Sequence, residues 1–240
     1  MLPAMHSHAH NVDEQEREKF DSLASDWWDP QGRLRTLHHI NPVRLRYIEQ
    51  RITLKNKIVL DLGCGGGLLS EAMAKNDAIV AGLDISQSAI AVAESHRQRE
   101  GLSIEYIVDS AEHYAEQHRQ KFDVITCMEL LEHVPDVDSL LNACSGMLKP
   151  GGDLFLATIN RSLQSYMAAI VAVEYCLKLL PKGTHDYARF IKPSELNKWL
   201  IRQGFRLVDI TGMSYIPGIN KCSLTRNPSI NYIAHARLAR

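Results

Sequence analysis

The chain has 240 residues, of which 45% are apolar and 23% charged, and its formal net charge at neutral pH is −1. This length and composition suit one sizeable α/β domain of a globular protein and are marginal for two domains. The near-zero charge excludes a protein that recruits nucleic acid through a strongly basic surface. None of the five cysteines lies in a Cys-x-x-Cys pair, which favours reduced thiols in the cytoplasm over a disulfide framework.

The first 54 residues are predicted to form a helical cover. Caps and charges indicate a helix over 13–24, which the aromatic pair Trp27-Trp28 follows. A second helix is expected to begin at Pro42, because the first helical position tolerates a missing N–H. The N-terminus lacks the basic region and apolar core that are typical of a signal peptide.

From residue 55 onward, short β-rich runs alternate with helical segments. Strands separated by helices of this length form right-handed βαβ units and a parallel sheet that is covered on both faces. The continuous apolar runs are typical of strands buried on both sides. Strands are predicted over 58–60, 78–83, 104–108, 122–126 and 153–158, with helices between them over 68–75, 86–99, 111–118 and 137–148.

This alternation breaks at residues 162–190, which are predicted to be an insertion. A helix over 193–202 and two strands over 205–213 and 232–238 follow, with no room for a helix between the two strands. The sequence therefore predicts an α/β, Rossmann-like domain over 55–240. Its sheet is expected to have seven strands, mostly parallel with an antiparallel final strand, and helices on both faces.

The stretch DLGCGGG (61–67) joins the first strand to a helix, which is where open α/β sheets bind ligands. Glycine allows a ligand to approach the backbone closely, and a helix N-terminus favours a negative or polar group. A dinucleotide fingerprint would need a third glycine where Leu68 stands. The pattern D-x-G-x-G-x-G is the motif of class I S-adenosylmethionine (SAM) methyltransferases, and it matches at Asp61, Gly63, Gly65 and Gly67.

Three residues at the ends of later strands support a SAM site. Asp84 ends the second strand, where a carboxylate can accept hydrogen bonds from vicinal ribose hydroxyls. Asp109 follows the third strand, where the adenine would lie, and Met128 follows the fourth, where it would pack on the cofactor. Because the carboxyl ends of parallel strands meet at one edge of a sheet, this joint placement predicts that the edge binds SAM.

Over nearly its whole length the sequence resembles the O-methyltransferases of ubiquinone biosynthesis, the UbiG family. The likeness is carried by WWDP, LHHINPVRLRYI, VLDLGCGGG, TCMELLEHVPD, LKPGGDLFLATINR and LPKGTHDYARFIKP. It implies that Arg44, Gly63, Asp84 and Met128 bind SAM, with Arg44 pairing with the methionyl carboxylate. It also implies polyprenyl catechol and demethylubiquinol as acceptors, methylated on a ring hydroxyl, and contacts with other enzymes of the pathway.

A phenol has a pKa of about 10, so methyl transfer to it needs a base or a cation beside the hydroxyl. Glu129, Glu132 and His133 follow the fourth strand, and at helical spacing they would share one face and hold a metal ion. Two carboxylates suit Mg²⁺, as in metal-requiring members of the family, whereas the imidazole is better suited to Zn²⁺ or Fe²⁺. Alternatively, Glu129 and His133 act at the substrate directly, with His133 as base or structural hydrogen-bonding group. His185, oriented by Asp186, is a second candidate base.

Residues 165–182 contain YMAAIVAVEYCLKLL, which is too short to span a bilayer. Its apolar face and its tyrosines and lysines predict a lid that dips into an anionic membrane surface, on a cytoplasmic enzyme held peripherally at the inner membrane. A helix packed on the domain or in a dimer contact is the alternative. Two other functions stay open: a SAM enzyme with another small phenolic or lipid acceptor, and a non-catalytic SAM-binding subunit associated with the membrane.

Overall fold

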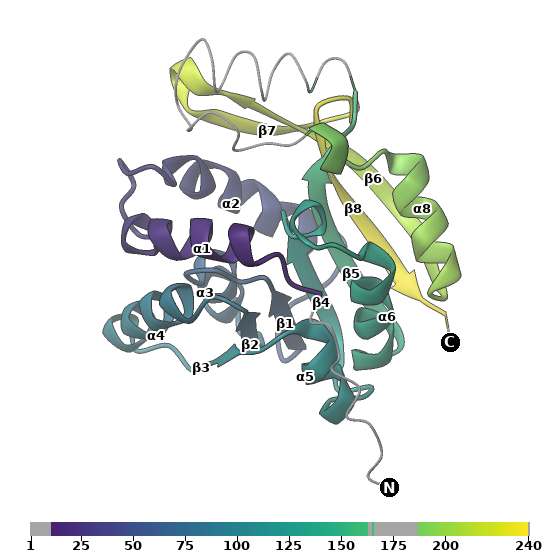
Figure 1. Cartoon of the computed structure of the whole chain (residues 1–240), viewed down its shortest axis with the longest axis horizontal. Coiled ribbons are helices and arrows are strands. Elements are labelled where there is room, and N and C mark those ends of the chain that lie inside the picture. Colours follow the sequence, from purple (N-terminus) through teal and green to yellow (C-terminus); the bar gives the residue numbers. More distant parts are fainter. Residues whose placement is uncertain (1–10, 163–164, 166–186, 240) are drawn as a thin grey trace, which may run out of the picture.

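An eight-stranded sheet forms the centre of the computed structural model, which describes residues 11–162, 165 and 187–239 (Figure 1). The strand order is β3-β2-β1-β4-β5-β8-β6-β7. Strands β1 to β5 pair in parallel, and β8 runs antiparallel between β5 and β6, which confirms the predicted α/β class and the antiparallel final strand. The strands are β1 (Ile58–Leu62), β2 (Ile79–Asp84), β3 (Ile104–Val108), β4 (Phe122–Met128), β5 (Leu148–Ile159), β6 (Phe205–Ile216), β7 (Lys221–Thr225) and β8 (Asn231–Leu238).

The predicted number of seven strands was wrong, because β7 was missed. This strand is only five residues long, and its sequence KCSLT alternates polar and apolar residues with just two apolar positions, too short a pattern to be recognised. It forms because β6 continues past its predicted end at residue 213 and turns back through the 3₁₀ turn η5 (Pro217–Ile219) to pair with β7. Pairing with β6, rather than the intrinsic propensity of its own residues, therefore determines the extended conformation of β7.

The helices alternate with the strands as predicted, and their N-terminal ends gather near the carboxyl ends of the parallel strands. The side chains of Ser86, Ser110 and Asp136 cap three of these helices by accepting hydrogen bonds from backbone N–H groups of the first turn. In Figure 1, α1 and α2 lie beside α3 and α4, whereas α6 and α8 lie on the other side of β5. The helices are α1 (Glu14–Leu23), α2 (Arg35–Glu49), α3 (Leu68–Ala74), α4 (Gln87–Glu100), α5 (Ala111–Gln117), α6 (Val137–Met147) and α8 (Pro193–Arg202), with 3₁₀ turns η1 (Ala24–Asp26), η2 (Leu131–His133) and η4 (Tyr187–Arg189).

The expected start of the second helix at Pro42 was also wrong. Helix α2 begins seven residues earlier, at Arg35, and contains Pro42 in its interior. Proline inside a helix removes one backbone hydrogen bond. The helix continues through it because Ile40, Val43 and Tyr47 are buried on both sides of the proline, so tertiary packing outweighs the local cost.

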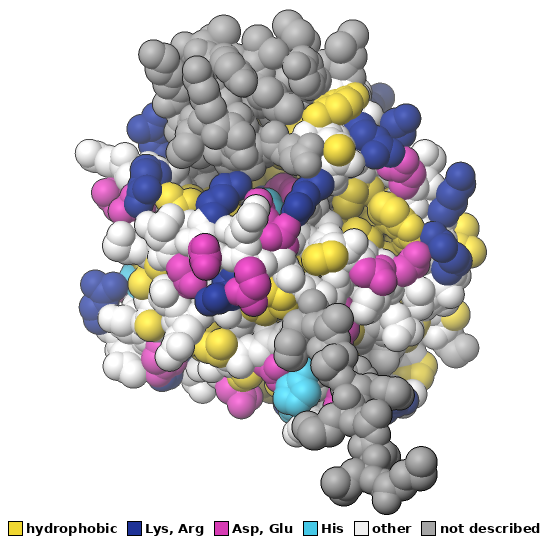
Figure 2. Space-filling model, in the orientation of Figure 1, with side chains coloured by type: hydrophobic (Ala, Val, Ile, Leu, Met, Phe, Trp, Pro, Cys, Tyr) yellow, Lys and Arg dark blue, Asp and Glu magenta, His cyan; other side chains and the backbone are white. Residues whose placement is uncertain are grey.

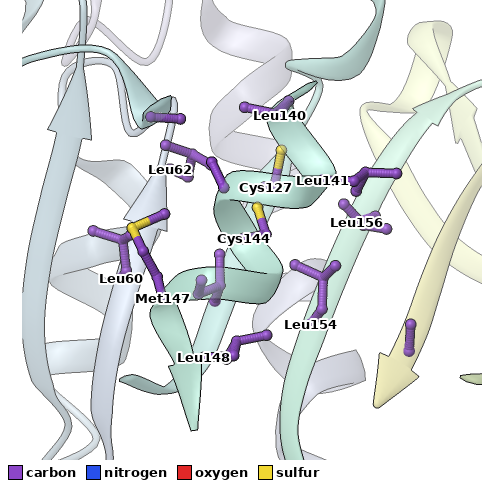
Figure 3. Close-up of a cluster of buried hydrophobic side chains, with 14 of the residues drawn as sticks. Leu60, Leu62, Cys127, Leu140, Leu141, Cys144, Met147, Leu148, Leu154 and Leu156 are labelled. Atoms are coloured by element: carbon purple, nitrogen blue, oxygen red, sulfur yellow. The ribbon is translucent and has the colours of Figure 1, made fainter. Parts of the chain in front are cut away.

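Two apolar clusters cover the two faces of the sheet. On one face, alternate residues of β1, β4 and β5 meet Leu140, Leu141, Cys144 and Met147 of α6 (Figure 3). On the other face, the intervening strand residues pack against α2 and α3. Both faces of the central strands are thus buried, as their continuous apolar runs indicated. The division into a cover over 1–54 and a domain over 55–240 stays a prediction.

Acidic and basic side chains are interspersed over the face shown in Figure 2, without a large field of one sign. Within the described part of the chain, no helix has the length and apolar character needed to cross a bilayer.

Candidate active site

The glycine loop between β1 and α3 depends on backbone conformations that side chains disfavour. Gly63, Gly65 and Gly67 have φ angles of +69°, +52° and +86°. A Cβ on Gly67 would also lie only 2.1 Å from the Tyr106 hydroxyl oxygen. The spacing of these glycines therefore has a structural cause: the chain must turn sharply from the strand end into the helix in a crowded space.

Asp84 connects this loop to the end of β2. Its Oδ2 accepts a hydrogen bond from the Gly65 N–H at 2.8 Å, and its Oδ1 accepts one from the Ser86 N–H at 2.9 Å. Burial raises its pKa, and these backbone donors oppose that rise by favouring the ionised form. Each carboxylate oxygen keeps a further lone pair, so the group fits the predicted role of accepting hydrogen bonds from ribose hydroxyls.

Asp109 lies beside Asp84, since its N–H donates to the Asp84 carbonyl oxygen at 3.1 Å. Its carboxylate accepts hydrogen bonds from the Ser110 N–H and contacts His113 Nδ1 at 2.8 Å, so it organises the start of α5. The structure thus brings two predicted cofactor residues, from neighbouring strands, to one edge of the sheet.

Asp61 is directed into the protein rather than toward this edge. Its carboxylate accepts hydrogen bonds from the hydroxyls of Ser70 at 2.6 Å and Thr126 at 2.7 Å, and only 3% of the residue is exposed. Burial raises its pKa. The motif aspartate therefore links the start of the glycine loop to α3 and β4 through these two hydrogen bonds.

Arg44 of α2 reaches the loop that follows β4. Its Nη2 lies 2.6 Å from Glu129 Oε1, and 6% of the residue is exposed. Its Nε is buried and has no hydrogen-bond partner among the described residues. A buried guanidinium with an unused donor suits a second carboxylate, so Arg44 fits its predicted contact with the methionyl group of SAM. Met128, also buried, ends β4 directly before Glu129.

Glu129, Glu132 and His133 do not lie on a helix, so the expected helical spacing was wrong. Glu129 has a φ of +56°, and only residues 131–133 form a 3₁₀ turn. Glu132 is buried and accepts a hydrogen bond from the Thr158 hydroxyl at 2.7 Å. Burial, with the nearby charge of Glu129, raises the Glu132 pKa well above its ordinary value and favours its neutral form.

These three side chains do not fit the predicted metal site in this arrangement. Each is directed to a different partner: Glu129 to Arg44, Glu132 to Thr158, and His133 to a carboxylate of α1. Across the described ranges, no three histidine, cysteine, aspartate or glutamate side chains gather closely enough to hold a metal ion. In this arrangement the three side chains offer no shared set of ligands to an ion.

The sequence reasoning missed how closely the segment before α2 covers the glycine loop. A Cβ built on Gly65 would lie 1.9 Å from the Trp27 ring, so this indole rests directly on the loop. The Trp28 Nε1–H donates to the Gly66 carbonyl oxygen at 2.8 Å, and its ring stacks on His96 with centroids 3.4 Å apart. The aromatic pair in WWDP was the available signal, but nothing in the sequence indicated its partner.

A cavity of about 610 Å³ lies next to Glu132, on the side of α6 and α8. Phe190, Ile191 and Trp199 are among its lining residues, whereas the residues of the glycine loop are not. The candidate base His185 and, apart from Ser165, the whole of the predicted membrane segment 165–182 lie outside the described residues.

The glycine loop, Asp84 and Arg44, placed at the carboxyl edge of a sheet with this strand order, define a class I SAM-dependent methyltransferase. A family model described as a methyltransferase domain matches residues 37–210. The fold is similar to that of magnesium protoporphyrin IX methyltransferase from Synechocystis PCC 6803 with bound SAM, with a TM-score of 0.66 and 19% identity over 100% of both chains.

Curated relatives are more closely similar in sequence. The chain is 55% identical to the ubiquinone biosynthesis O-methyltransferase of Coxiella burnetii (strain RSA 331) over 224 residues, which cover 93% of this chain and 95% of the relative. It is 49% identical to the protein of the same name from Azoarcus sp. (strain BH72), over 95% of this chain and 97% of that one. The chain belongs to the ubiquinone biosynthesis O-methyltransferase family.

Proposed function

We propose that this chain transfers the methyl group of SAM to ring hydroxyls of polyprenyl catechol and demethylubiquinol intermediates, and so performs both O-methylation steps of ubiquinone biosynthesis. The observation that carries this proposal is the 55% identity to an O-methyltransferase of that pathway over 93% of the chain. The glycine loop, Asp84 and Arg44 support SAM as the methyl donor. The presence of Glu129, Glu132 and His133 argues against a non-catalytic SAM-binding subunit, which would not need them.

In the reaction a phenolic O–CH₃ bond forms as the S–CH₃ bond breaks, and the phenolic proton leaves to a base. Bound SAM supplies the electrophilic methyl group. The chain must hold the hydroxyl in line with that methyl group and receive the proton, and positioning of this kind supplies much of the rate. His133 and Glu129 are the described candidates for proton acceptor, and His185 is a further one. Glu132 is better suited to donate a hydrogen bond, because its neutral form is favoured.

The direct test is methyl transfer from labelled SAM to a short-chain polyprenyl catechol, with the same ring fully O-methylated as the control acceptor. We expect labelled product from the catechol alone. We also expect turnover to persist in EDTA, because Glu129, Glu132 and His133 each have another partner. Turnover that stops in EDTA and returns with Mg²⁺ would mean that these contacts open in the working enzyme. Intact binding of SAM without turnover of any prenylated catechol would contradict the proposed acceptor.

We further propose that residues 165–182 contact an anionic membrane surface, which would hold a cytoplasmic enzyme at the inner membrane beside other enzymes of the pathway. The apolar run with its flanking lysines supports this. In liposome co-sedimentation we expect binding to anionic vesicles that Ile170→Glu abolishes. Ile201→Glu, at an exposed isoleucine of α8, is the matched control. Equal sedimentation with and without vesicles would overturn the proposal.

A further inference from the structure

The hairpin formed by β6 and β7 projects beyond the edge of the sheet that carries the cofactor residues. Strand β6 pairs with β8 only as far as Met213, which lies opposite Asn231, the first residue of β8. All of β7 pairs with residues 212–216 of β6, so the hairpin extends past the carboxyl end of β5 (Figure 1). Both β5 and β6 are antiparallel to β8, so β6 ends on the same side as Asp84 and Glu129.

One face of this hairpin is packed against α2. A small apolar cluster joins the two and consists of Ile40 and Val43 of α2, Met213 of β6, and Cys222 and Leu224 of β7. The Tyr215 ring stacks on His39 of α2 with centroids 6.0 Å apart, and its hydroxyl oxygen lies 3.1 Å from His39 Nδ1. That hydroxyl also donates to Asn220 Oδ1 at 3.0 Å. Contacts with α2 therefore determine where the turn of the hairpin lies.

The tip of the hairpin, residues 216–221, exposes two apolar side chains. Ile216 is 50% exposed and Ile219 is 66% exposed. Side chains alternate along a strand, so Ile216 and its cross-strand neighbour Lys221 lie on the face opposite the buried Met213. Single exposed isoleucines are ordinary on a protein surface, whereas two on one fixed turn beside a lysine are typical of a segment that enters a membrane interface.

The charges in this part of the chain have one sign. Residues 210–231 contain Lys221 and Arg226 and no aspartate or glutamate. Both basic side chains are exposed. A surface that combines exposed isoleucines with cations is complementary to a bilayer with anionic headgroups, because the apolar side chains reach the acyl boundary while the cations stay among the headgroups.

The hairpin also lies beside the point where the proposed membrane segment begins. Asn160 Nδ2 donates to the Pro228 carbonyl oxygen at 2.8 Å, and the Ser162 hydroxyl donates to the carbonyl oxygen of Ser229. These bonds fix the end of β5 to the turn between β7 and β8. Segment 165–182 follows Ser162 closely in the sequence, so the chain enters that segment next to the hairpin.

We propose that the tip of the β6–β7 hairpin, with Ile216, Ile219 and Lys221, is a second contact with an anionic membrane surface. A protein held at one segment can rotate about it, whereas two contacts fix the carboxyl edge of the sheet toward the bilayer. The acceptor ring then reaches the site while its polyprenyl tail stays in the acyl layer. The proposal rests on the proposed function in one respect, the membrane-borne acceptor.

The first test locates the contact without any substitution. Hydrogen exchange of the native chain is followed by mass spectrometry with and without vesicles of phosphatidylglycerol and phosphatidylcholine. With these vesicles we expect amides over 215–222 to exchange at least about fivefold more slowly, and amides over 197–204 of α8 to be unaffected. Vesicles of phosphatidylcholine alone should give no such protection. Unchanged exchange over 215–222 on anionic vesicles would overturn the proposal.

The second test is co-sedimentation of variants with the same vesicles. Ile219→Glu should lower the partition coefficient at least about tenfold and Lys221→Glu at least about fivefold, because an apolar and an electrostatic contribution are lost in turn. Ile201→Glu on α8 and Lys57→Glu, directly before β1, make the same changes near the opposite edge of the sheet. Both controls should bind as the native chain does. Native binding of Ile219→Glu would contradict the proposal.

Turnover and association measurements separate this contact from the proposed function. Ile219→Glu should methylate a short-chain catechol in free solution at the native rate, and a long-chain one in anionic vesicles more slowly. If vesicle binding depends on Ile219 but the native chain methylates no catechol, the proposed function fails and the membrane contact stands. A dimer in sedimentation velocity that Ile219→Glu dissociates, with vesicle binding unchanged, would assign the tip to a second copy of the chain and overturn the proposal.

Discussion

The Asp84→Asn variant is expected to bind S-adenosylhomocysteine, the product form of the cofactor, about 100-fold more weakly than the native chain. Both carboxylate oxygens already accept backbone N–H groups, from Gly65 at 2.8 Å and Ser86 at 2.9 Å. An amide directs an NH₂ group at one of these donors, and it also removes the charge that strengthens hydrogen bonds to ribose hydroxyls. Isothermal titration calorimetry with the purified variant measures the change in affinity.

The matched control is Asp77→Asn. Asp77 lies on the surface with a side chain that is 69% exposed, and its ion-pair partner Lys55 is 3.7 Å away. Such a pair contributes little to stability, and asparagine tolerates the positive φ of 62° at this position. Its affinity for the cofactor product should equal that of the native chain. If Asp84→Asn retained native affinity as well, Asp84 would have no part in the cofactor site.

The second large effect is expected at Arg44. Replacing it by methionine should lower the free energy of unfolding by about 2 to 3 kcal/mol, because Glu129 is left without its partner close to Glu132. The loss is smaller than for a fully buried pair, since 26% of the Glu129 side chain is exposed. The variant should also bind S-adenosylhomocysteine at least about tenfold more weakly, because the buried guanidinium is the expected partner of the cofactor carboxylate. Urea unfolding and calorimetry measure the two quantities separately.

The double variant Arg44→Met, Glu129→Gln distinguishes the two roles of the arginine. Removing the unpaired carboxylate should restore most of the lost stability, since both partners of the pair are then neutral. The affinity for S-adenosylhomocysteine should stay low, because nothing replaces the guanidinium. Native affinity in the double variant would show that Arg44 acts only by pairing with Glu129.

The gathering of the predicted cofactor residues at one edge of the sheet was predictable, because it depends on local order along the chain. The glycine loop, Asp84 and Asp109 each follow a strand, and parallel strands bring their carboxyl ends to one edge of the sheet. The orientation of a side chain at such a strand end was not predictable in the same way. Asp61 occupies the motif position, yet it is turned inward by hydroxyl groups from α3 and β4 that no spacing rule indicates.

The errors in the fold arose where local propensity and tertiary packing disagree. Proline predicted a helix start at position 42, but buried neighbours carry α2 through it. The Glu129 backbone adopts a left-handed conformation directly after β4. Glu129, Glu132 and His133 therefore do not follow one another at the α-helical spacing that was predicted from the sequence. Strand β7 has too little apolar pattern to be recognised without its partner β6.

Local patterns in the sequence were enough to predict the alternation of strands and helices, the class of the sheet and the position of the glycine loop, because the periodicity of apolar residues and the placement of glycine act over a few neighbouring residues. Which side chains come together around that loop depends instead on long-range packing. Arg44 meets Glu129 across 85 residues and Glu16 meets His133 across 117. These contacts depend on how α1 and α2 pack against the folded domain. Many weak long-range contacts stabilise that packing, and short sequence patterns do not predict them.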